Sequence, residues 1–262
     1  MLIVVPCDFT PVVDTAFQYV ACLEKFHPVI DVHLLHVVEK AQSAPEAEAE
    51  LARIAERYSS TSSLKVKPVV CEGAIATEIP GYAEEVHADL IIMGIHETKG
   101  LAKLFASKAV RVVIDSNIPF LVVQNPPQDE NPFDRILMPL GALGIEKGKF
   151  EWAVRNAKLY GSHIFVFTEP YNDAQLISRR DGNILTMCKV FDANAIKYTV
   201  IPSDKTDSFK NNLIEFAKEK EIDMLLIMIT QGLKPMMNST DQQLMSNPLG
   251  LPVLCINPSM IS

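Results

Sequence analysis

The residues best suited to hold a small molecule follow an apolar run in the first half of the chain. Residues 93–108 carry Gly94, Gly100 and Ser107 along a stretch that leads from this run through a polar loop. A strand, a glycine, a loop and a serine-capped helix can together present backbone N–H groups and the positive end of a helix to a phosphate. The alternative is a loop whose glycines only permit tight turns. The pattern by itself favours this alternative.

The cysteines and histidines form no ligand pattern. The five cysteines are odd in number and scattered among apolar residues, without Cys-x-x-Cys spacing, so we expect buried free thiols and a reducing cytoplasm. His33, His36 and His96 fall near predicted strand ends, but a metal needs about three or four converging ligands. The sequence also lacks a P-loop, an HExxH helix, a nucleophile elbow and a paired-carboxylate arrangement typical of acid–base catalysis. We therefore predict no metal site and no catalytic residue, which disfavours an enzyme.

The composition is that of a folded globular protein without nucleic-acid or membrane features. Hydrophobic residues make up 48% of the 262 residues, charged residues make up 21%, and the net charge is −8. An acidic chain without a Lys/Arg cluster is repelled by nucleic acid, and no apolar run approaches the roughly 20 residues of a membrane helix. Residues 1–6 are apolar without a basic start, which predicts a buried first strand rather than a signal peptide.

Strands and helices alternate along the first half. Residues 2–7 form a continuous apolar run, which predicts a strand that is buried on both faces. Further strands are predicted at residues 32–38, 65–71, 90–93 and 119–124. Thr10 and Pro11 have the residue types of a helix N-cap and a proline at the first helical position, so a helix is predicted to start there. Further helices are predicted at residues 45–58, 75–85 and 107–115.

The second half repeats this plan. Residues 3–8 match residues 136–141, and an aromatic pair follows eleven residues beyond each aligned proline, Pro6 and Pro139. Strands are predicted near residues 135–140, 163–168, 196–201, 224–229 and 252–257.

A polar, proline-rich segment around residues 124–132 reads as a linker between the halves. We place the first domain at residues 1–127 and the second at residues 128–262. Strands separated by helices pair in parallel with right-handed crossovers. Each domain is therefore expected to be α/β, a Rossmann-like, doubly wound, five-stranded parallel sheet. Ligands of such sheets bind at the carboxyl ends of the strands.

Several segments of the first half resemble the universal stress protein family. Residues 93–96 with Gly100, together with residues 119–123, are similar to the family's C-terminal signature, and residues 4–8 resemble its first strand with a terminal acidic residue. The resemblance covers nearly the whole chain as two consecutive domains, and it is degenerate in the second. It implies an adenine-nucleotide-hydrolase-like fold in which the first and fourth strands are neighbours. It also implies pairing of the two domains through their last strands, residues 119–124 and 252–257.

The resemblance further implies a candidate nucleotide pocket in the first domain, with ATP as its ligand. Its candidate residues are Pro6, Asp8, Val37, Met93, Gly94, Gly100 and Ser107. In ATP-binding members an acidic residue placed like Asp8 approaches the adenosine part of the ligand. The alternative is a turn aspartate whose charge complements the dipole of the following helix. The two interpretations have equal support.

The phosphate-binding motif of ATP-binding members is broken in this chain. That motif is Gly-x2-Gly-x9-Gly-Ser/Thr, and only its first glycine is kept, as Gly94, whereas Glu97, Ser107 and Lys108 replace the rest. A carboxylate about 4 Å from a phosphate would cost on the order of 1–4 kcal/mol. In the second half Gly141 stands at the position of Asp8 and Ile229 at that of Gly94, so no nucleotide site is expected there.

The sequence therefore favours a tandem universal stress protein of the cytoplasm that acts as a stress-response binding or regulatory module, with its ATP signature largely lost. The alternative is an adenine-nucleotide binding protein, for ATP or AMP, with slow hydrolase activity in the first domain. A different small-molecule ligand and assembly into a homo-oligomer both stay open. Nucleic acid and membrane partners are not expected.

Overall fold

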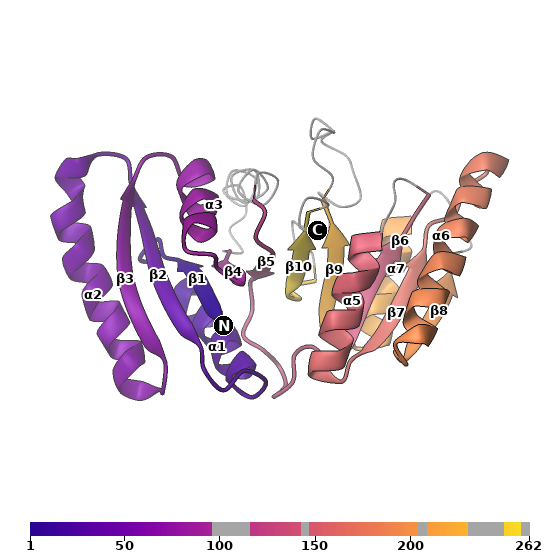
Figure 1. The fold of residues 1–262 in the computed structure, drawn as a ribbon, viewed down its shortest axis with the longest axis horizontal. Coiled ribbons are helices and arrows are strands. Elements are labelled where there is room, and N and C mark those ends of the chain that lie inside the picture. Colours follow the sequence, from indigo (N-terminus) through magenta and orange to yellow (C-terminus); the bar gives the residue numbers. More distant parts are fainter. Residues whose placement is uncertain (96–115, 143–146, 204–208, 230–248, 258–262) are drawn as a thin grey trace.

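The computed structural model describes residues 1–95, 116–142, 147–203, 209–229 and 249–257. In this part of the chain a single sheet of ten strands is covered by helices on both faces (Figure 1). The chain thus has the predicted α/β, Rossmann-like class, with a sheet that is mostly parallel.

The first half contains five strands and three described helices. In chain order they are β1 (Leu2–Pro6), α1 (Val12–Glu24), β2 (Asp31–Val38), α2 (Ala44–Thr61), β3 (Lys65–Glu72), α3 (Ile75–Glu85), β4 (Leu90–Gly94) and β5 (Phe120–Val123), and a short 3-10 turn at Ala41–Ser43 precedes α2. The helix predicted at residues 107–115 lies outside the described residues.

The second half has the same succession. Its elements are β6 (Arg135–Leu140), α5 (Lys147–Tyr160), β7 (His163–Thr168), α6 (Ala174–Ala193), β8 (Tyr198–Pro202), α7 (Phe209–Glu219), β9 (Met224–Met228) and β10 (Val253–Ile256). All ten predicted strands are present, with ends that differ by at most two residues from the predicted ones.

The strand order shows the same topology twice. The sheet runs β3-β2-β1-β4-β5-β10-β9-β6-β7-β8. Strands within each half pair in parallel, whereas β5 and β10 pair antiparallel, with Leu254 opposite Leu121. The first and fourth strands are neighbours in each half, as expected. The two five-stranded sheets are continuous rather than merely facing one another.

Each face of the sheet packs against its own set of helices. One core cluster joins side chains from α1, α2, α5 and α6 to the sheet, and the other joins side chains from α3 and α7 to it. Ile3, Val4 and Val5 of β1 are all fully buried, as the continuous apolar run predicted for a strand covered on both sides.

The start of α1 differs from the prediction. The helix begins at Val12, Pro11 precedes it, and no side chain caps it. Thr10 instead donates from its backbone N–H and its hydroxyl to Asp8 Oδ1. Thr10 therefore belongs to a turn with Asp8 that precedes the helix, since short polar side chains readily bond to nearby backbone and side-chain groups.

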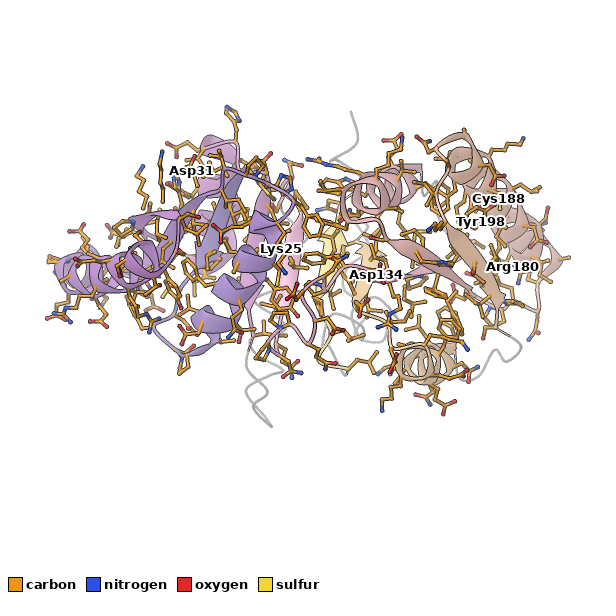
Figure 2. All side chains as sticks on the ribbon, turned by 90° about the horizontal axis from the view of Figure 1, so that it is seen from below. Lys25, Asp31, Asp134, Arg180, Cys188 and Tyr198 are labelled. Atoms are coloured by element: carbon orange, nitrogen blue, oxygen red, sulfur yellow. The ribbon has the colours of Figure 1, made fainter. Side chains whose placement is uncertain are left out.

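The linker is tied to the first half near the boundary between the halves. Lys25, which follows α1, points toward this boundary (Figure 2). Its ammonium lies 2.9 Å from Glu130 Oε2, and this pairing lowers the pKa of the Glu130 carboxyl. The pair is exposed, so it orients the linker more than it stabilises the fold.

Candidate functional site

A cavity of about 100 Å³ lies at the carboxyl ends of β1, β2 and β4. Five of the seven predicted site residues line it, namely Pro6, Asp8, Val37, Met93 and Gly94. Gly100 and Ser107 lie outside the described residues, as does Glu97. Parallel pairing of β1 with β2 and with β4 brings these strand ends together, as the rule for ligand sites in parallel sheets requires.

Asp8 reaches the cavity from a tight turn between β1 and α1. Its Oδ1 accepts the Thr10 backbone N–H at 3.1 Å as well as the Thr10 hydroxyl. The residue is exposed, so its charge is met by both a local turn and solvent. Asp8 is thus a turn aspartate that also lines the cavity.

His36 and Phe9 add a polar and an aromatic group at the same strand ends. His36 Nδ1 lies 2.7 Å from the carbonyl oxygen of Cys7, and since a carbonyl only accepts, Nδ1 carries the proton. The centroids of the Phe9 ring and the imidazole lie 4.2 Å apart. Phe9 has a left-handed backbone conformation with φ 62°. Non-glycine residues seldom adopt this conformation. The turn therefore holds the phenyl ring over His36 at a local conformational cost.

The remaining wall of the cavity is apolar. Leu35 of β2, Met93 of β4, and Ile75 and Ile79 at the start of α3 line it. Burial raises the pKa of the Cys7 thiol, which is 5% exposed. A thiol of this kind is a poor nucleophile. The described residues thus offer an apolar slot with a carboxylate and an imidazole nearby, and they include no activated nucleophile.

Gly94 is required by packing and not only by a ligand. A β-carbon at this position would lie 2.7 Å from the backbone carbonyl oxygen of Val12 and 2.9 Å from its side chain. The end of β4 therefore approaches the first turn of α1 too closely for any side chain. The glycine keeps this packing possible whether or not a phosphate lies nearby.

The corresponding edge of the second half is occupied by its own side chains. Ala142 N donates to Tyr171 Oη at 3.0 Å, Tyr171 Oη donates to Glu169, and Asn183 Nδ2 donates to the carbonyl of Gly141 at 3.0 Å. A β-carbon on Gly141 would lie 2.7 Å from Glu169 Oε2. Gly141, the counterpart of Asp8, thus leaves room for a carboxylate from the neighbouring strand.

The register identifies that carboxylate as the counterpart of Val37. Pro6 pairs with Leu35 in the first half and Pro139 pairs with Phe167 in the second. Two residues further along stand Val37 and Glu169. The acidic group has therefore moved from the first strand end to the second.

Several contributors to these sites were not predicted. The sequence pointed to His36 because it lies near a predicted strand end. Phe9, Ile75 and Ile79 lie near the ends of predicted strands and helices, and no motif marks them as site residues. Tyr171 and Glu169 lie in a loop after β7, and sequence spacing alone does not show that their side chains fold back over the end of β6.

The described residues contain no cluster of three or more side chains suited to a metal ion. None of the helices that the structure describes is long and apolar enough to cross a membrane.

Comparison with known proteins identifies relatives of the chain. The sequence model of the universal stress protein family matches residues 1–124. A universal stress protein of Synechocystis sp. is 35% identical over 135 residues, a match that covers 46% of this chain and 83% of that protein.

Solved structures resemble the whole chain. The crystal structure of a universal stress protein from Archaeoglobus fulgidus has a TM-score of 0.78 and 15% identity, with 98% of each chain covered. A putative universal stress protein from Pseudomonas aeruginosa has a TM-score of 0.62 and 16% identity, with 98% of this chain and 92% of that one covered. At such identities the likeness concerns the fold alone.

Proposed function

The chain belongs to the universal stress protein family, and on this basis we propose that it is a two-domain binding module of the stress response. Its first domain, residues 1–127, would hold a small molecule at the carboxyl edge of its strands. Its second domain, residues 128–262, would be a structural partner without a ligand site of this type. The repeated strand order and the antiparallel pairing of β5 with β10 support this division.

One observation carries the proposal: the two corresponding sheet edges differ in what fills them. In the first half Asp8 and Val37 border a cavity, whereas in the second half Tyr171 and Glu169 cover the end of β6. The five cysteines are free in the structure, which supports a reducing compartment such as the cytoplasm.

The size and chemistry of the first cavity favour part of a ligand over a whole nucleotide. Small-molecule sites usually enclose between about 300 and 1,000 Å³, and this one encloses about 100 Å³. Its apolar wall suits a flat ring such as a nucleobase. Glu97, which replaces a glycine of the ATP motif, opposes phosphate binding. We therefore propose that ATP is not bound in the family's ATP-type mode and that the chain is not a hydrolase.

Calorimetric titration of the full chain with ATP and Mg²⁺, and separately with adenosine, tests this function. We expect no saturable heat at millimolar ATP and weak, saturable heat with adenosine that Val37→Trp abolishes by filling the cavity. Micromolar ATP binding that Asp8→Ala abolishes would overturn the proposal and support the alternative of an adenine-nucleotide protein with slow hydrolysis. The absence of heat with adenosine would also count against a ligand site at this edge.

A further inference from the structure

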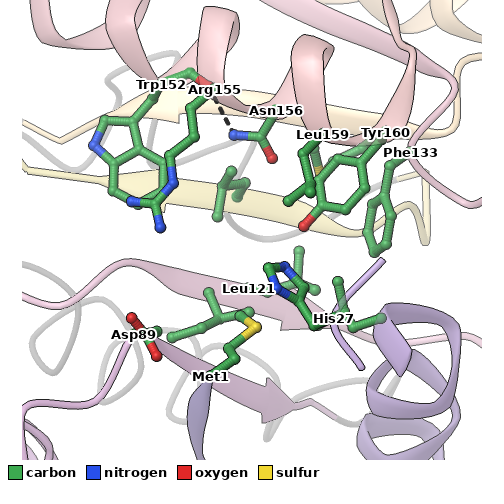
Figure 3. A pocket seen from close by; sticks show the side chains of 14 residues that line it. Met1, His27, Asp89, Leu121, Phe133, Trp152, Arg155, Asn156, Leu159 and Tyr160 are labelled. Carbon is green, nitrogen blue, oxygen red and sulfur yellow. Dashed lines mark hydrogen bonds between the residues drawn. The ribbon is translucent and has the colours of Figure 1, made fainter. Parts of the chain in front are cut away.

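A second and larger cavity, of about 250 Å³, lies between the two halves (Figure 3). Leu121 of β5 and Leu254 of β10 are paired across the boundary between the halves, and both line it. Leu23 of α1 and Trp152 of α5 also line it, one from each half. The cavity therefore exists only because the halves are joined, and it is separate from the strand edge that carries Asp8.

Asn156 presents an unused hydrogen-bond acceptor to this cavity. The residue is 6% exposed, and its Nδ2 donates to the carbonyl oxygen of Trp152 at 2.7 Å. This bond fixes the orientation of the amide, because only the NH₂ group can donate to a carbonyl. Oδ1 consequently points into the cavity (Figure 3) and accepts no hydrogen bond from the described residues. An amide oxygen that lines a cavity in this way can accept a hydrogen bond from a ligand.

Tyr160 presents a donor from the same helix. Its ring is held between Phe26, at 4.8 Å between ring centroids, and Phe133, at 4.6 Å. The hydroxyl points into the cavity (Figure 3), and none of the described residues bonds to it. Burial raises the pKa of Tyr160 to about 12, so the hydroxyl keeps its proton and can donate at neutral pH.

Positive charge borders the same cavity. The guanidinium of Arg155 lies 5.0 Å from the centre of the Trp152 ring, and both residues line the cavity. His27 points into it from the first half (Figure 3). Burial, followed by nearby cations that include Arg155, lowers the pKa of His27, so the imidazole is uncharged at neutral pH. Asp89 is the acidic group of the lining, and its Oδ2 is engaged by the backbone N–H of Leu2 at 2.7 Å.

We propose that this inter-half cavity binds a small amphipathic monoanion. The apolar body of the ligand, of the size of an aromatic ring, lies against the paired side chains of Leu121 and Leu254. A hydroxyl or N–H group of the ligand donates to Asn156 Oδ1, and its carboxylate meets Arg155. Because the cavity is lined from both halves, an occupied cavity holds the halves together more tightly than an empty one.

The test uses 4-hydroxyphenylacetate, which has a ring, a hydroxyl and a carboxylate. Trp152 is the single tryptophan of the chain, so its fluorescence, excited beyond the absorption of the phenol, reports binding at this cavity. We expect a saturable change in emission. We also expect Asn156→Leu and Arg155→Gln each to weaken binding about tenfold, the effect of one charge-assisted or buried hydrogen bond.

Two controls separate recognition from damage to the fold. Phenylacetate, which lacks the hydroxyl, should bind the wild-type chain about tenfold more weakly and should be indifferent to Asn156→Leu. Lys158→Gln removes an exposed positive charge from the same helix and should leave binding unchanged. A change in emission that does not saturate, or equal affinities of the two probes for the wild-type chain, would overturn the proposal. Equal affinity of 4-hydroxyphenylacetate for wild type and Arg155→Gln, which keeps the fold because Arg155 is exposed, would overturn it as well.

Discussion

At corresponding strand ends the first half carries Asp8 and Val37, and the second half carries Gly141 and Glu169. The strand order of the two halves is the same, so the difference between these positions lies in their side chains. In the second half the carboxylate stands directly after the neighbouring strand β7, where it accepts from Tyr171, and that tyrosine accepts from Ala142 N. Where the first half has a carboxylate beside a cavity, the second half has a carboxylate one strand further on that accepts a hydrogen bond from Tyr171.

The glycines at these two edges, Gly94 and Gly141, also differ in what surrounds them. Gly94 is needed because a backbone carbonyl, that of Val12, comes too close for a β-carbon. Gly141 is needed because the ends of two side chains, Glu169 and Tyr171, come too close. A glycine in a site signature can therefore be kept for packing alone, and the nature of the neighbour decides how costly its replacement is.

The largest expected effect comes from placing the same methyl group in both halves. We expect Gly94→Ala to lower the free energy of unfolding by about 3 kcal/mol and Gly141→Ala to lower it by about 1 kcal/mol, because overpacking against backbone is relieved less easily than overpacking against side-chain ends. Urea denaturation followed by circular dichroism measures both. Adding Glu169→Ala should remove most of the loss caused by Gly141→Ala. Equal losses in the two halves would contradict the distinction drawn between the glycines.

A smaller effect is expected from removing one hydroxyl near each carboxylate. Tyr171→Phe deprives Ala142 N of its acceptor at a half-buried position and should cost about 1–2 kcal/mol. Thr10→Val removes the hydroxyl that bonds the exposed Asp8 and should cost about 0.5 kcal/mol, since solvent replaces the lost bond. Thermal unfolding of the two variants gives the comparison. A larger loss in Thr10→Val would mean that the first edge, and not the second, is held by its side chains.

The smallest expected effect is the dependence of the free energy of unfolding on pH, to which one histidine in each half should contribute alike. Burial, and then a nearby lysine, lowers the pKa of His33 in the first half and of His163 in the second. The unfolded chain therefore binds protons before the folded chain does, and the free energy of unfolding should fall as the pH drops below about 6.5. Replacing either histidine with glutamine should flatten the profile between pH 7 and 5, which denaturant melts at several pH values measure. A wild-type profile that is flat over this range would contradict the prediction.

The strands could be predicted because their signal is local. All ten predicted strands are present, and central strands such as β5, β9 and β10 are apolar throughout because both of their faces are buried. The start of α1 was predicted wrongly, because spacing does not show that the Thr10 hydroxyl donates to Asp8 and that the helix begins two residues later.

The candidate site could be predicted only in part. Residues at strand ends, such as Pro6 and Gly94, meet wherever parallel strands end together. The hydrogen bonds of Tyr171 to Ala142 and of Asn183 to Gly141 depend on the path of a loop and on a side chain from α6. The cavity between the halves depends on two helices that are more than a hundred residues apart along the chain. Such contacts leave no periodic trace in the sequence.

The antiparallel ladder between β5 and β10 has a consequence for how the sheet ends. Each of these strands would be an edge strand with unpaired backbone groups if its half stood alone, and here the two strands pair with each other. The sheet is left with two outer strands, β3 and β8. The outer strand β3 carries exposed Lys65, Lys67 and Pro68, and lysine or proline on an outer strand opposes the addition of a further strand. Joining the halves thus pairs two edge strands with each other and leaves β3, an edge strand whose residues oppose aggregation, on one side of the sheet.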